Sequence, residues 1–134
     1  MHFNTIVIII VILIIFLWVF LIAKFSKKST KISTEKKAYF NKLLKRIRIN
    51  TSAKEQIIDL DKLLHKILQE VWYTGTFWEI LKQEPKEIIN LNKVWEIHKL
   101  RNKLVHDFDL MTENMLKKKS QEYSKEIKKI LSKI

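Results

Sequence analysis

The chain has 134 residues and a formal net charge of +12, enough for one domain of roughly a hundred residues and an accessory segment. It contains one glycine, one proline and no cysteine. Scarce glycine and proline argue against a turn-rich β fold, and the lack of cysteine excludes disulfides, thiolate catalysis and cysteine-ligated zinc. Because the four histidines form no HxxxH or HExxH pattern, we expect neither a metal nor a cofactor.

The N-terminal segment is strongly apolar. Residues 6–23 are eighteen consecutive apolar residues, and with residues 3–5 they would form a helix of about 31 Å, the thickness of a hydrocarbon core. A cleaved signal peptide is the alternative, but it would have a basic start, a shorter apolar stretch and a small-residue cleavage site. We therefore predict an uncleaved transmembrane anchor at residues 1–23.

Positive charge is concentrated directly after this segment. Residues 24–50 carry ten Lys or Arg against one acidic residue, whereas residues 51–134 carry sixteen against thirteen. Under the positive-inside rule, the first lysines place the C-terminal domain in the cytoplasm, which predicts a single-pass protein of the cell membrane. The same lysines suit anionic lipid, with nucleic acid as the alternative partner. They are Lys24, Lys27, Lys28 and Lys31.

The remainder of the chain has the periodicity of helices. Residues 24–50 are interpreted as a basic juxtamembrane linker and helix, and residues 51–134 as a helical domain. Ser52–Glu55 and Thr76–Glu79 each have the sequence of a capping box, which marks a helix start. We predict an all-α fold, a transmembrane helix followed by a bundle of four or five helices. Its main helices are expected at about 52–72, 91–106 and 112–132.

The stretch from residue 98 to residue 107 carries the clearest chemistry. Arg101, Asn102 and His106 are polar residues within an otherwise apolar helical pattern. An arginine binds phosphate with a fixed fork of donors, and a histidine moves protons near neutral pH, so the pair suits metal-free cleavage of a phosphodiester. In the alternative interpretation, His106 only caps the C-terminus of a helix beside Asp107.

Three features in this order resemble the HEPN superfamily of small helical domains, whose mark is an Arg, four to six residues and then a His. They are the Asp61-Lys62-Leu63-Leu64 run in a capped helix, the Gly75-Thr76 loop, and the run from Trp95 to His106. The resemblance covers about residues 52–134. The chain is also similar to uncharacterised small bacterial proteins with one membrane span and a cytoplasmic helical domain.

The resemblance implies a metal-independent endoribonuclease that is active as a homodimer. Arg101 would bind the scissile phosphate, His106 would act as general base or acid, and Asn102 would orient one of them. His98 would support the site or be a packed core histidine, and Asp61 would pair with Arg101 in a site or in a structural bridge. The tryptophans at 72, 78 and 95 are predicted to belong to the core, with base stacking as the alternative.

Two other functions stay open at this point. Many HEPN domains lack activity, so the alternative to an RNA-cleaving enzyme is a non-catalytic helical module that binds a nucleotide or a protein at the cytoplasmic face of the membrane. The third interpretation is a membrane-surface scaffold built on the basic segment at residues 24–50.

Overall fold

The computed structural model describes residues 2–25, 31–50, 52–106 and 111–134, with side chains described over residues 7–21, 31–49, 52–106 and 111–134. The described residues form six helices and no strand, which confirms the predicted all-α class. The helices are α1 (His2–Phe25), α2 (Thr34–Asn50), α3 (Ala53–Glu70), α4 (Phe77–Lys82), α5 (Leu91–His106) and α6 (Glu113–Lys133).

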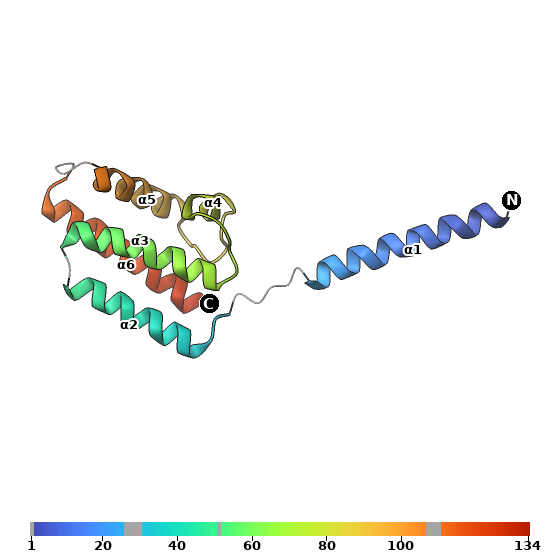
Figure 1. Cartoon of the computed structure of the whole chain (residues 1–134), viewed down its shortest axis with the longest axis horizontal. Coiled ribbons are helices and arrows are strands. Elements are labelled where there is room, and N and C mark those ends of the chain that lie inside the picture. The colour runs from blue at the N-terminus through green and yellow to red at the C-terminus, as the bar shows by residue number, and fades with distance from the viewer. Residues whose placement is uncertain (1, 26–30, 51, 107–110) are drawn as a thin grey trace.

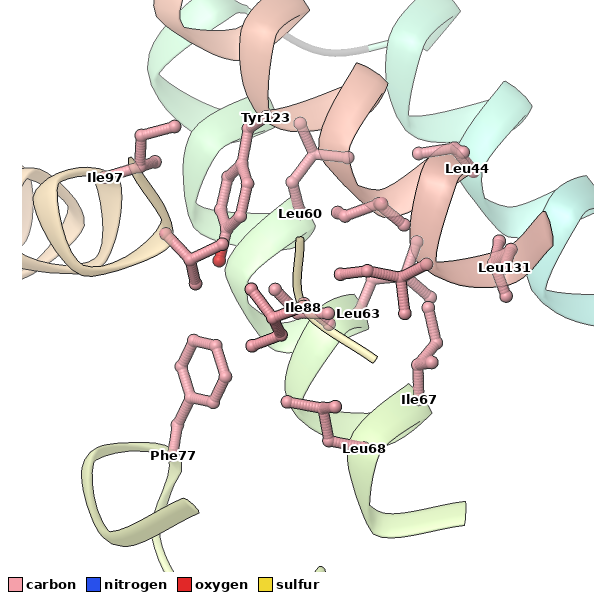
Figure 2. Packing of buried hydrophobic residues seen from close by; sticks show 14 of the residues in the cluster. Leu44, Leu60, Leu63, Ile67, Leu68, Phe77, Ile88, Ile97, Tyr123 and Leu131 are labelled. Atoms are coloured by element: carbon pink, nitrogen blue, oxygen red, sulfur yellow. The ribbon is translucent and has the colours of Figure 1, made fainter. Parts of the chain in front are cut away.

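Helix α3 is the centre of the bundle. It packs against α2, α5 and α6, and α6 also contacts α2 and α5 (Figure 1). The apolar stripe of α3 recurs every three or four residues and is fully buried at Ile57, Leu60, Leu64 and Ile67. Figure 2 shows Leu60 and Ile67 of this stripe in the same cluster as Tyr123 and Leu131 of α6 and Ile97 of α5, which form one core.

Helix α2 contributes to the same core. Phe40 and Leu44 are buried, and the Lys37 ammonium donates to the backbone oxygen of Ile134 at 3.0 Å, which ties α2 to the end of α6. The bundle therefore includes residues from the segment 24–50, and not only the domain expected from residue 51 onward.

The helix starts follow local side-chain chemistry. In both predicted capping boxes the hydroxyl accepts from the backbone three residues on, and the carboxylate of that residue accepts from the cap, so both predictions are confirmed at Ser52–Glu55 and Thr76–Glu79. Asn90 accepts from the backbone N–H of Lys93 at 3.0 Å and so caps α5. These local bonds fix where α3, α4 and α5 begin.

Helix α1 lies apart from the bundle in Figure 1. Its described side chains are all exposed, from 41% at Leu21 to 73% at Phe16. Across the part of the chain that the structure describes, no helix has both the length and the apolarity needed to cross a membrane.

This finding corrects the prediction of a transmembrane anchor at residues 1–23. The single-pass membrane localisation that was derived from that anchor is wrong with it, and the cytoplasmic orientation of the C-terminal domain loses its basis. The expected contact with anionic lipid had the same basis. Of the lysines assigned to it, Lys31 is exposed, and the side chains of Lys24, Lys27 and Lys28 lie outside the described residues.

Candidate functional site

A buried carboxylate lies where α3, α5 and α6 meet. Asp61 follows Leu60 on the inward face of α3, and its side chain is only 6% exposed. A buried carboxylate without partners would cost several kcal/mol, so its surroundings must supply hydrogen bonds and positive charge. The neighbouring helices provide both.

Two buried side chains bind this carboxylate directly. The Tyr123 hydroxyl, from α6, donates to Asp61 Oδ1 at 2.8 Å. The His98 Nδ1, from α5, lies 3.0 Å from Oδ2 and 3.2 Å from Oδ1. Figure 2 shows the Tyr123 ring directed into the core among apolar side chains, and the residue has no exposed surface.

Asn102 and Arg101 extend the network towards the surface. Asn102 Nδ2 lies 3.4 Å from His98 Nε2, and Arg101 Nη1 donates to Asn102 Oδ1 at 3.0 Å. If Asn102 accepts from Arg101, its amide nitrogen must donate to His98 Nε2. We therefore assign the His98 ring proton to Nδ1, where it is donated to Asp61.

Arg101 connects this hydrogen-bond network back to Asp61. Its Nε lies 3.8 Å from Asp61 Oδ2, an ion pair that also gives the carboxylate a positive partner. The Nε atom is buried and has no hydrogen-bond partner among the described residues, whereas the side chain as a whole is 29% exposed. One part of the guanidinium is thus held against Asp61, and another part faces the solvent. We name the set of Asp61, His98, Arg101, Asn102 and Tyr123 the polar centre.

His106 lies outside the polar centre. It is the last residue of α5 and is exposed, and its imidazole makes no hydrogen bond to another described residue. On a regular helix Arg101 and His106 point about 140° apart. The structure therefore brings Arg101, Asn102, His98 and Asp61 together, but it does not place His106 against Arg101 within the chain. Asp107, its expected neighbour in the capping interpretation, lies outside the described residues.

Burial changes the acidity of Tyr123. Desolvation in the core raises the pKa of its hydroxyl well above the usual value, and the adjacent Asp61 carboxylate raises this pKa further, while Arg101 lowers it. Tyr123 therefore stays protonated and continues to donate its hydrogen bond to Asp61 far into the alkaline range.

Tyr123 is the member of the polar centre that sequence reasoning missed. A signal did exist, because a buried tyrosine hydroxyl needs an acceptor and Asp61 interrupts the apolar stripe of α3. The sequence alone did not show that Tyr123 and Asp61, which are 62 positions apart, are partners.

The tryptophans also differ from the prediction. Trp72 is 62% exposed and Trp78 is 43% exposed, while Trp95 is partly buried against the core. The assignment of all three to the core is therefore wrong for Trp72 and Trp78.

No group of three or more His, Cys, Asp or Glu side chains among the described residues could hold a metal ion. The polar centre itself offers only one carboxylate and one imidazole, with both imidazole nitrogens already engaged. Comparisons with family models, curated proteins and solved structures find no match to the chain.

Proposed function

We propose that this chain is a HEPN-like, metal-independent endoribonuclease that cuts RNA with Arg101 and His106. The observation that carries the proposal is the way in which the Arg101 side chain is held. Asp61 and Asn102 fix this side chain in place while part of it remains open to solvent. A guanidinium positioned in this way is suited to bind a phosphate and to stabilise the extra charge that develops on it during cleavage.

His106 supplies the proton chemistry. In the proposed reaction the 2′-hydroxyl oxygen of RNA attacks the adjacent phosphorus and its proton leaves to a base. The bond from phosphorus to the 5′-oxygen breaks, and that oxygen takes up a proton. The products are a 2′,3′-cyclic phosphate and a 5′-hydroxyl. The exposed His106 imidazole performs one of the two proton transfers, and water performs the other.

The other members of the polar centre position the arginine. Asp61 holds Nε, and Asn102 holds Nη1. His98 is buried, and its nitrogens face Asp61 and Asn102, so it acts by fixing Asn102 and does not touch RNA. Because Arg101 is held by Asp61 and Asn102 and points away from His106 around α5, the two reach one phosphate from two copies, or from one chain only if RNA binding releases the arginine from these partners.

Product analysis tests the reaction directly. The full chain is incubated with single-stranded RNA in EDTA, and the ends of the products are identified. We expect 2′,3′-cyclic phosphate and 5′-hydroxyl ends, and no cleavage of DNA of the same sequence, which lacks the nucleophile. Intact RNA, or products with 3′-hydroxyl ends, would contradict the proposal. Binding of intact RNA or of a protein would then favour the non-catalytic module.

Mixing two inactive variants decides how the site is assembled. Arg101→Lys and His106→Ala are combined in equal amounts after each has been assayed alone. Recovery of cleavage in the mixture means that two copies contribute to one site. No recovery means that both residues act from the same chain. The expected homodimer stays a prediction until this measurement is made.

A further inference from the structure

Two tryptophans form a corner on the surface beside the polar centre. Trp78 from α4 and Trp95 from α5 have ring centroids 4.5 Å apart with an angle of 80° between their planes. Trp95 also lies edge-to-face with His98, at 6.2 Å. The two tryptophans therefore contact the polar centre through His98.

This corner is one wall of a groove of about 450 Å³. The other lining residues are polar: Lys82, Asn92, Glu96 and Lys99. The Lys82 ammonium lies 5.5 Å from the centre of the Trp78 ring. Glu96 is paired with Lys119, so the acidic residue is neutralised and the groove keeps an excess of positive charge.

The groove and His106 lie along one face of α5. Trp95, Lys99, Asn102 and His106 are spaced by four, three and four residues, which places them on the same side of the helix. The distance along the axis from Trp95 to His106 is about 16 Å. A flexible polymer lying on this face would therefore contact the aromatic corner and the proposed catalytic end within a few of its units.

We infer that the Trp78–Trp95 groove binds an unpaired base of single-stranded RNA and so positions the strand for cleavage. This inference deepens the proposed function and rests on it. A planar base lying flat on one ring would meet the other ring with its edge, which is the favourable arrangement for aromatic groups. Lys82 and Lys99 are placed to contact the phosphates on either side of that base.

Single-stranded RNA fits the groove better than a duplex. In a duplex the bases are stacked on one another and their faces are not accessible, whereas an unpaired base presents its face to an aromatic side chain. The lysines supply attraction to the backbone without reading sequence. We therefore expect recognition of an unpaired strand with little sequence preference at this position.

The test measures binding separately from cleavage. Full-length protein carrying His106→Ala is titrated with a short fluorescent oligouridylate. We expect Trp78→Ala in this background to weaken binding about tenfold or more, which is the effect of losing one stacked base. Trp78→Phe, which keeps an aromatic face, should recover most of the affinity. Trp72→Ala is the matched control, because Trp72 is also exposed but does not line the groove.

A second probe separates stacking from charge. An oligomer of the same length without bases should bind weakly, and Trp78→Ala should change its affinity little. Equal affinities for the two oligomers, or an unchanged affinity after Trp78→Ala, would overturn the inference. It would also be overturned if Trp78→Ala changed only the sedimentation of the protein, because the groove would then be a contact between copies.

The two proposals fail in different ways. If RNA is cut but Trp78→Ala has no effect on binding, the proposed function stands and the base-binding groove does not. If binding depends on Trp78 but no RNA is cut, the groove stands and the chain is a binding module.

Discussion

Asp61 is the residue on which the polar centre depends. It accepts hydrogen bonds from Tyr123 and His98 and pairs with Arg101, so one carboxylate on α3 orients three side chains from α5 and α6. Loss of an acceptor in a buried network leaves each donor unsatisfied, at about 1–3 kcal/mol per group. The proposed phosphate site is therefore tied to the stability of the bundle.

Replacement of Asp61 tests this dependence. We expect Asp61→Ala to lower the free energy of unfolding by about 2–5 kcal/mol, because it leaves the buried donors of Tyr123 and His98 without an acceptor. Asp61→Asn keeps one acceptor oxygen and should lower it less. Asp59→Ala, on the more exposed side of the same helix, should change it by about 0.5 kcal/mol or less. Urea unfolding of the three variants gives the comparison, and equal values for Asp61→Ala and Asp59→Ala would refute the assignment.

Tyr123 makes the stability of the folded protein depend on pH in the alkaline range. Its pKa is raised in the folded protein above the usual 10.0, mainly by burial and then by Asp61. Above pH 10 the unfolded chain loses this proton while the folded chain keeps it. The unfolded state then binds fewer protons, so stability must fall as the pH rises.

We therefore expect the stability of the wild type to decline above pH 10 more steeply than that of Tyr123→Phe. At neutral pH the same variant should be less stable by about 1 kcal/mol, because it lacks the hydrogen bond to Asp61. Unfolding measured from pH 7 to pH 11 checks both the decline above pH 10 and the difference in stability at neutral pH. Tyr73, whose pKa is also raised by burial and by Glu87, is present in both proteins and cancels in the comparison. Parallel curves for the two proteins would contradict the account.

At the scale of the elements, the loop before α4 is constrained at Gly75. Gly75 has φ of +107°, and a Cβ added there would lie 2.7 Å from Glu79 Oε2, the carboxylate oxygen that caps α4. Gly75→Ala should therefore destabilise the protein by about 1–2 kcal/mol, through backbone strain and through displacement of the cap.

The double variant separates these two causes. In a Glu79→Ala background the carboxylate is gone, so the effect of Gly75→Ala should shrink to the backbone strain alone. Thermal or urea unfolding of the four proteins in the cycle measures the difference. An undiminished effect in the double variant would assign the whole penalty to the backbone.

The elements also show what a sequence can predict. The caps at Ser52 and Thr76 depend on residues three apart, so the sequence contains the whole interaction. The partners of Asp61 lie 37 and 62 positions away, and their meeting depends on how α5 and α6 pack on α3. The exposure of Trp78 likewise depends on the position of α4 and not on its periodicity. Local chemistry was thus predictable, while the closed polar network and the aromatic groove were not.

At the scale of the whole molecule, composition predicted the class of the fold but not the placement of its first helix. Few glycines and prolines and a helical periodicity led correctly to an all-α bundle. The apolar run near the N-terminus led to a membrane span that the described residues do not provide. The bundle then arranges the polar centre, the aromatic groove and His106 along α5, which is the basis of the proposed function.

Single-turnover cleavage of single-stranded RNA in EDTA, measured with unfolding of the same samples, tests that function most directly. We predict that His106→Ala slows cleavage by about a hundredfold or more while changing the free energy of unfolding by less than about 1 kcal/mol, because His106 is exposed at the end of α5. Arg101→Lys should slow it by a similar factor, since lysine keeps the charge beside Asp61 but loses the fork of donors. Lys103→Ala, exposed in the same helical turn, should leave the rate unchanged. Equal rates for the wild type and His106→Ala, or losses that follow only the unfolded fraction, would contradict the account.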